Sequence, residues 1–327
     1  MNSAAKLFAR CLWACAAVVT WAGFANAETY PSRPIHLIVA YAPGGTGDVI
    51  ARMVSEKLGE KLHQAIVVEN KAGATGAIGA RYVASASPDG YTLLVGQTAE
   101  IAINQHLFED QGYNQDKDLI PIALAGVVPL ALTVPASAPY STLTDFLKVL
   151  KSGKEITFAS AGTGTPGHFA GEMLKLRIKA NMTHVPYKGA GPALNDLLGN
   201  HVDMYFPGFP AVMQHMKGGT LKILATSTAK RVQLAPDVPS VAEVAGINGF
   251  DFSLWAGLFA PKGTPPQVIA KINSAFNDVL RDSQIHQRLV DTGAEVNPMS
   301  TEEFAAFVHS ESEKYISLIK ETGLKAR

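Results

Sequence analysis

Two stretches of the chain repeat one order of hydrophobic and polar positions: an apolar run, a glycine-rich turn and an amphipathic segment. In the first stretch, 34–62, the nearly continuous apolar run predicts a strand that is buried on both faces, as in a parallel sheet. The turn at 43–47 leads into residues whose apolar positions recur at helical spacing, which predicts a helix with one buried face. The second stretch, 156–177, has its turn glycines at positions 162, 164 and 167.

A strand that leads through such a turn into a helix has a consequence for binding. The first N–H groups of a helix have no partner within the helix, and the helix dipole places positive charge at the same end. Each turn is therefore suited to an anion. Two such units, far apart in the chain, predict two α/β lobes whose loops face each other across a central cleft.

Further short apolar runs predict the remaining strands. They alternate with segments of helical spacing, which favours parallel or mostly parallel sheets. The chain is expected to pass into the second lobe within 119–134 and to return along 252–260. The expected lobes are 28–128 with 251–327, and 129–250. The other predicted strands are 65–68, 91–95, 182–186, 200–206 and 221–226.

The first 27 residues differ from the rest. Lys6 and Arg10 precede an apolar segment, 11–24, that is too short to span a bilayer comfortably. Ala25-Asn26-Ala27 then fits the small-residue pattern of a cleavage site. The segment 1–27 is therefore predicted to be a cleaved signal peptide, and the mature protein is predicted to be periplasmic.

Composition narrows the function further. The formal net charge is zero, so no basic surface indicates nucleic acid or an anionic membrane as a partner. Both cysteines, Cys11 and Cys15, lie in the predicted signal peptide, which leaves the mature chain without thiol chemistry. The histidines are scattered singly, and we expect no metal and no cofactor.

Motifs of catalysis match poorly. The glycines at 162, 164 and 167 fit a dinucleotide fingerprint, but Pro166 is unusual there and no acidic residue ends the next strand. Ser160 stands in Ala159-Ser160-Ala161, which is not the nucleophile turn of a hydrolase. No catalytic residue is assigned.

Several polar residues have two interpretations each. Asp48 either complements the helix dipole or faces the cleft and accepts a hydrogen bond from a ligand. Asp203 is expected to pair with backbone or Lys188, and a ligand contact is the alternative. Tyr187 and Lys188 follow a strand end, where ligands of α/β proteins usually lie, although Lys188 also reads as a surface lysine.

Taken together, the motifs resemble the Bug, or TctC-like, family of periplasmic solute-binding receptors of tripartite tricarboxylate transporters. The resemblance covers the whole mature chain. Its segments, in order, are APGGTGDVIAR (43–52), VVENKAGATGAIGA (67–80), SPDGYTLL (87–94), GTPGHFAGE (164–172), HVPYKGAGPALNDLLGNHVD (184–203), APDVPSVAEV (235–244) and WAGLFAPKGTPP (255–266).

The resemblance implies a two-lobed periplasmic binding protein of type II that closes on a small carboxylate, is not an enzyme, delivers its ligand to membrane transporter subunits, and acts as a monomer. The acid would be a di- or tricarboxylate, an acidic amino acid or an aromatic acid. The implied ligand contacts are Gly44, Gly45, Asp48, Thr98, Ser160, Gly162, Thr163, His168, Tyr187 and Asp203. Two glycine-rich turns depart from the usual family pattern, at 71–76 and at Thr46-Gly47.

Two other functions remain open from the sequence. One is an exported enzyme on the same scaffold, with His168 or Lys188 as the acid–base group. The other is a receptor that serves a signalling partner instead of a transporter.

Overall fold

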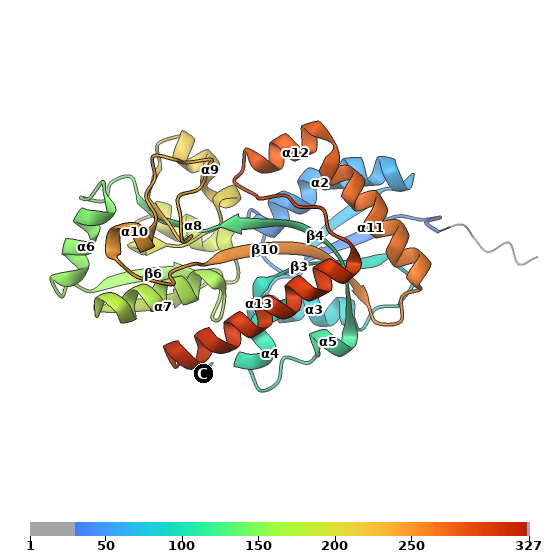
Figure 1. Ribbon diagram of the computed structural model, residues 1–327, viewed down its shortest axis with the longest axis horizontal. Coiled ribbons are helices and arrows are strands. Elements are labelled where there is room, and N and C mark those ends of the chain that lie inside the picture. Colours follow the sequence, from blue (N-terminus) through green and yellow to red (C-terminus); the bar gives the residue numbers. More distant parts are fainter. Residues whose placement is uncertain (1–29, 326–327) are drawn as a thin grey trace, which may run out of the picture. The chain divides into compact units, whose positions relative to one another are not determined.

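Two five-stranded sheets organise the part of the chain that the computed structural model describes, residues 30–325 (Figure 1). From Arg33 onward the chain forms one compact unit that holds both sheets. The predicted signal peptide lies outside the described residues. We call each sheet, with the helices that cover it, a lobe.

The first lobe is built on the sheet β2-β1-β3-β10-β4. Its strands are β1 (Ile35–Val39), β2 (Ile66–Asn70), β3 (Thr92–Gln97), β4 (Leu119–Pro129) and β10 (Ser253–Pro261). Its helices are α2 (Thr46–Leu62), α3 (Ala77–Ala84), α4 (Asn104–Leu107), α5 (Gln115–Asp118), α11 (Pro266–Arg281), α12 (Ser283–Val290) and α13 (Thr301–Thr322), with the short turns η2 (Ala74–Gly76) and η3 (Ala99–Ile103), the latter a π-helix.

The second lobe repeats this plan on the sheet β7-β6-β8-β5-β9. Its strands are β5 (Ala131–Pro135), β6 (Ile156–Ser160), β7 (Met182–Pro186), β8 (Met204–Tyr205) and β9 (Leu221–Thr226). Its helices are α6 (Leu143–Lys151), α7 (Pro166–Ile178), α8 (Ala190–Leu198), α9 (Phe209–Lys217) and α10 (Val241–Ala245).

Strand directions confirm the prediction of parallel pairing only in part. In the first sheet β1 is parallel to β2 and β3, but β10 is antiparallel to β3 and β4. In the second sheet β6 is parallel to β7 and β8, but β5 is antiparallel to β8 and β9. The antiparallel strands β4, β5 and β10 belong to the segments that pass between the lobes. These strands are not joined to their neighbours by a crossover helix within one sheet, so the expectation of parallel pairing does not extend to them.

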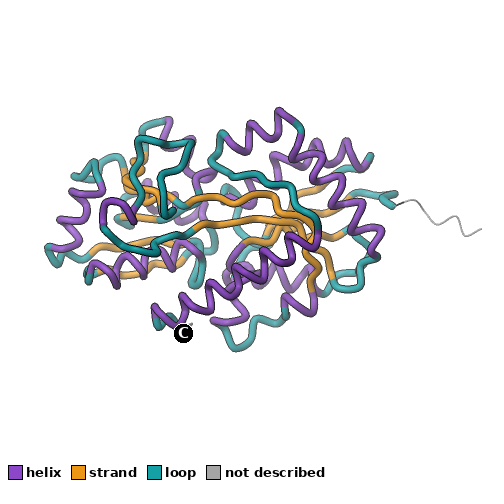
Figure 2. The backbone as a smooth tube through the Cα atoms, in the orientation of Figure 1, coloured by secondary structure: helices purple, strands orange, loops and turns teal. Residues whose placement is uncertain are grey.

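The passages between the lobes lie side by side. β4 pairs with β10 along its length, from Leu119 opposite Pro261 to Pro129 opposite Ser253, and Figure 2 shows these two long strands together. After β4 only Leu130 intervenes before β5 begins. The buried Ser227 hydroxyl contacts both passages, because it lies within hydrogen-bonding distance of Leu130 and of the Phe252 carbonyl.

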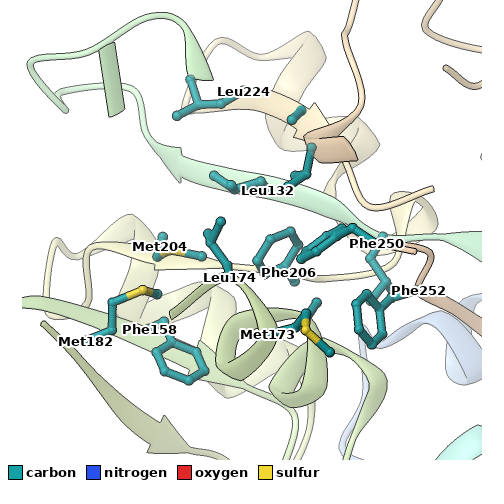
Figure 3. Packing of buried hydrophobic residues seen from close by; sticks show 14 of the residues in the cluster. Leu132, Phe158, Met173, Leu174, Met182, Met204, Phe206, Leu224, Phe250 and Phe252 are labelled. Atoms are coloured by element: carbon teal, nitrogen blue, oxygen red, sulfur yellow. The ribbon is translucent and has the colours of Figure 1, made fainter. Parts of the chain in front are cut away.

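Each lobe has a core, and the core of the second lobe also takes in Ala99, Ile103 and Tyr315 from the first lobe. In the second lobe, Leu132, Leu174 and Phe206 lie close together, and Phe158 belongs to the same buried cluster (Figure 3). In the first lobe aromatic rings pack among aliphatic side chains: Trp255 meets Phe304 edge-on, with ring centroids 6.1 Å apart and an interplanar angle of 89°. Each lobe is thus large enough to be held by burial of apolar surface without disulfides.

Of the predicted strands, 200–206 and 252–260 differ in how far the structure agrees with them. The predicted strand 200–206 is wrong in extent, since only Met204–Tyr205 pairs as β8. The preceding residues are bent because the Asp203 carboxylate accepts hydrogen bonds from the Thr157 N–H and hydroxyl, at 2.8 and 2.9 Å. The predicted strand 252–260 is confirmed by β10. The lobe boundaries at 128/129 and 250/251 stay a prediction.

No helix within residues 30–325 combines the length and apolar character that a membrane crossing requires.

The close packing of β10 under α13 gives a test of the first core. A Cβ on Gly257 would collide with the Phe304 ring and lie 2.8 Å from the Ala123 carbonyl oxygen. We expect Gly257→Ala to lower the free energy of unfolding by about 2 kcal/mol through overpacking, measured by urea denaturation. Gly218→Ala is the matched control, because Gly218 has φ −79° and no neighbour closer than 3.3 Å to the new methyl group. Equal stability of the two variants would contradict this account of the core.

Candidate functional site

The turn before α2 is shaped by Asp48. Its Oδ2 accepts from the Gly44 N–H at 3.0 Å, and its Oδ1 accepts from the side chains of Arg52 and Asn70, each at 3.0 Å. Burial acts to raise the pKa of Asp48, but these hydrogen bonds outweigh it and the net pKa is lowered. Gly44 has φ +83°, which suits glycine. Asp48 thus stays ionised and holds the glycine turn in shape.

The corresponding turn before α7 is held by neutral side chains. His168 Nδ1 accepts from the Gly164 N–H at 3.0 Å, and the Ser160 hydroxyl lies 2.6 Å from His184 Nε2. The two imidazoles are stacked, with centroids 3.7 Å apart. Burial lowers the pKa of His168 to about 3 and that of His184 to about 4. Both rings are therefore neutral near pH 7 and act as hydrogen-bonding supports of the loop 161–165.

Four helices begin at one place between the lobes. They are α2, α7, α8 and α9, with N-cap residues Gly45, Thr165, Gly189 and Gly208. At none of these four N-caps does a side chain accept a hydrogen bond from the start of the helix, which is also true of α3, α4 and α11, whereas α6 and α13 are capped by Thr142 and Ser300. Four positive helix ends without side-chain caps converge on one point.

A small cavity, of about 30 Å³, lies at that point. Its wall includes the apolar side chains of Leu130, Phe206 and Leu254 and the polar side chains of Gln97 and Tyr205. No Lys, Arg, His, Asp or Glu belongs to the cavity wall as described. Burial raises the pKa of Tyr205 above its usual range, so its hydroxyl remains neutral and able to donate. An anion here would be held by neutral donors and helix dipoles.

The two lobes touch around this cavity. The Ala42 N–H donates to the Lys188 carbonyl at 3.4 Å, and the Thr75 hydroxyl donates to the Thr163 carbonyl at 2.9 Å. A Cβ on Gly191 would collide with the Pro43 carbonyl oxygen. The backbones can approach this closely only because glycine stands at such positions. The structure therefore shows the lobes closed on each other.

A second, more open hollow lies beside the cavity. This groove has a volume of about 950 Å³ and is lined by both lobes. The loop 161–165 separates the two spaces, because Ala161 and Thr165 line the cavity whereas Gly162 and Thr163 line the groove.

The structure distributes the ten residues predicted as ligand contacts over three places. Gly45 lines the cavity, and Gly162, Thr163, His168 and Tyr187 line the groove. The others support the frame. Gly44 and Asp48 bond to each other, Ser160 bonds to its own loop, the Thr98 hydroxyl accepts from the Trp255 N–H at 2.9 Å, and Asp203 accepts from Thr157.

Sequence reasoning missed several residues of the cavity wall. Gln97 and Tyr205 end two strands, but neither stands beside a glycine motif. Gly208 precedes Phe209-Pro210, and proline in the first turn of a helix was a usable signal for the start of α9.

Glu100 is a buried carboxyl group next to this site. Its Oε1 accepts from the Gln97 N–H at 2.7 Å, and its Oε2 lies 2.8 Å from the hydroxyl of Tyr41, which lines the cavity. Burial raises the pKa of Glu100 to about 8, although hydrogen bonds from its own N–H, from Gln97 and from Tyr41 act in the other direction. Glu100 is therefore mainly protonated at neutral pH and adds no full negative charge near the cavity.

Comparison with known proteins agrees with this fold. The profile of the tripartite tricarboxylate transporter family receptors matches residues 50–324. The periplasmic binding protein BugD superposes with a TM-score of 0.87 at 34% identity, over 91% of this chain and all of that one (100%). Rpa4515 of R. palustris, solved with adipate, gives 0.87 at 30% identity over 90% and 99% of the two chains. MatC of Rhodopseudomonas palustris, solved with malate, gives 0.83 at 33% identity over 89% and 100%.

The chain therefore belongs to the tripartite tricarboxylate transporter receptor family and has the two-lobed periplasmic binding protein fold. It is a solute-binding receptor and not an enzyme.

The raised pKa of Glu100 predicts a stability change with pH. The unfolded chain loses this proton near pH 4.5 and the folded protein near pH 8, so the folded state is progressively disfavoured as pH rises between these values. Glu100→Gln, which mimics the protonated group, should match the wild type in stability near pH 4.5 and exceed it by about 4 kcal/mol at pH 8. Urea denaturation at several pH values measures this, with the exposed Glu56→Gln as control. A difference that does not grow with pH would refute the assignment.

The contact at Gly191 predicts a variant that cannot close. Gly191→Ala favours helix α8 by itself, since alanine is the better helix former, but its methyl group meets the Pro43 carbonyl of the other lobe. We expect unchanged or raised thermal stability together with a loss of ligand affinity of about tenfold or more, measured by calorimetry. Asn195→Ala, exposed on the same helix, is the control and should keep full affinity. Full affinity in Gly191→Ala would mean that binding does not require this closed arrangement.

Proposed function

We propose that this receptor captures a small organic carboxylate between its lobes and delivers it to the membrane subunits of a tripartite transporter. The observation that carries the proposal is the meeting of four helix N-termini without side-chain caps at a small cavity between the lobes. Backbone N–H groups at helix starts are favourable partners for a carboxylate, and exclusion of water strengthens each such hydrogen bond.

The relatives solved with adipate and malate support a carboxylate as the ligand class. Within this proposal Gly45 contacts the acid directly, and the other predicted residues either line the approach or hold the loops. Gln97 and Tyr205 supply neutral hydrogen-bonding groups for the remainder of the ligand.

Size places a condition on capture. A cavity of about 30 Å³ has room for one or two water-sized groups, whereas malate and adipate are several times larger. Binding such an acid therefore requires the lobes to separate, or side chains such as Leu254 and Phe206 to move. A two-state receptor of this kind shifts toward the closed form when an acid bridges the two lobes.

The remaining elements of the proposal concern cell biology. We propose that residues 1–27 direct export to the periplasm and are removed, that the mature protein acts as a monomer, and that 28–128 with 251–327 moves against 129–250.

A thermal-unfolding panel tests the proposed function. The mature protein, from Glu28 onward, would be heated with malate, adipate, citrate, glutamate or benzoate. An acid at one hundred times its dissociation constant should add about 2.7 kcal/mol, which is roughly a 5 °C rise for a chain of this size. Adipamide, which has the length of adipate but no charge, should give no shift.

Gly45→Val is the binding-site control, because a side chain larger than Cβ would extend toward Ala190, whose Cβ lies 3.6 Å from the position of a Cβ on Gly45. It should abolish the shift. Mass spectrometry of the untreated protein identifies any acid already bound. An unresponsive protein with nothing bound would contradict the carboxylate proposal.

A further inference from the structure

Thr75 has an unusual backbone that its neighbours hold in place. It is a β-branched residue with φ +50° and ψ +47°, a region that such residues rarely adopt. Its carbonyl accepts from Asn104 Nδ2 at 2.9 Å and from the Tyr41 hydroxyl at 3.3 Å. Two first-lobe side chains therefore fix the orientation of this residue, and rare conformations of this kind are characteristic of functional positions.

The result of this orientation is a bond between the lobes. Thr75 Oγ1 donates to the backbone carbonyl of Thr163 at 2.9 Å. Gly162 makes room for it, because a Cβ there would lie 2.8 Å from Thr75 Oγ1. The loop that accepts the bond is the one that the imidazole of His168 supports through Gly164. Both ends of the bond are thus held by their own lobe.

The bond lies in the wall between cavity and groove. Thr75 and Thr163 both line the groove, while Tyr41, which holds Thr75, lines the cavity on the other side. The groove is also lined by the basic residues Arg81, Lys175, Lys188 and Lys325 and by the acidic residues Asp110 and Glu172, of which Glu172 lies 3.6 Å from Lys175. Separating Thr75 from Thr163 would join the cavity to the more open groove, whose lining has more basic than acidic residues and so favours an anion.

Two other polar contacts between the lobes are less suited to holding the loops together. The ion pair of Arg177 with Glu321 joins α7 to α13, but both side chains are more than 40% exposed, and exposed pairs contribute little. The Ala42–Lys188 hydrogen bond, at 3.4 Å, is long.

We propose that Thr75 is a positioning residue that latches the closed lobes by its hydrogen bond to Thr163, and that the groove is the route by which an acid enters and leaves the cavity. The role in retaining an acid rests on the proposed function, whereas the latch itself is a property of the ligand-free protein. The hydrogen bond between Thr75 and Thr163 involves no charged side chain.

The absence of cysteine after Cys15 permits a direct test. Ser85→Cys and Asn181→Cys place spin labels at exposed positions in the two lobes, near the two sides of the groove. Pulsed electron paramagnetic resonance on the ligand-free mature protein should show one short distance between the two spin labels. Adding Thr75→Val, which removes the hydroxyl at nearly constant volume, should raise the ratio of open to closed forms about 2- to 10-fold, the range expected for one hydrogen bond.

Three further variants make the test specific. Thr163→Val should leave the distances unchanged, because the acceptor is the backbone carbonyl. Thr75→Ser keeps the hydroxyl and should stay closed. Thr75→Gly removes the hydroxyl but suits the positive φ, so it separates loss of the latch from poor folding and should open. A wild type that is open without ligand, a closed Thr75→Val, or opening by Thr163→Val would each overturn the latch.

Release of malate provides the functional readout. In stopped-flow experiments Thr75→Val should release malate faster by the same factor of about 2 to 10, whereas Thr163→Val should match the wild type. Equal release rates for both variants would overturn the role in retention. If malate does not bind the wild type, the distance measurement still decides the latch, and the acid panel separately decides the proposed function.

Discussion

The close approach of backbone to backbone between the two lobes is the constraint on which the site depends. Helix dipoles and N–H groups act over short distances, so helix ends from two sheets must come together before they can hold one anion. Gly191 lies against Pro43 and Gly208 against Thr46, and a methyl group at either glycine would separate the lobes. The glycine turns therefore serve two ends: they expose N–H groups, and they allow the lobes to meet.

The residues around the cavity keep it free of charge. Asp48, although ionised, is directed into its own turn, where Gly44, Arg52 and Asn70 satisfy it. Burial keeps Glu100 and the two stacked imidazoles neutral at ordinary pH. A negative charge facing the cavity would repel a carboxylate, and a fixed positive charge would need its own desolvation. Neutral donors avoid both difficulties, while closure supplies the low-dielectric surroundings in which they are effective.

The strands that pass between the lobes bear on the proposed movement of one lobe against the other. β4 and β10 run together between the sheets, and the Ser227 hydroxyl bonds to both passages, at Leu130 and at Phe252. The Thr75–Thr163 and Gly191–Pro43 contacts are made by loops and by the start of α8, whereas Gly208 lies against the first passage, at Val128 and Leu130. In the proposed movement a rotation about the passages would separate the loops, and the first-lobe residues that pack in the second core, Ala99, Ile103 and Tyr315, would have to shift with it.

The sequence by itself determined the local units of this protein. Apolar runs, glycine turns and helical spacing predicted β1, α2, β6, α7 and β10, because these signals arise from neighbouring residues and need no knowledge of the fold. The motifs also predicted the family. Only the tertiary structure decided which turn residues share a space. Gly45 and Ala161 line the cavity while Gly162 and His168 face the groove, and Tyr205 reaches the cavity from a strand with no motif of its own. The physical reason is that a cavity is formed by segments from both lobes, so its wall depends on how the two sheets meet and not on any one stretch of chain.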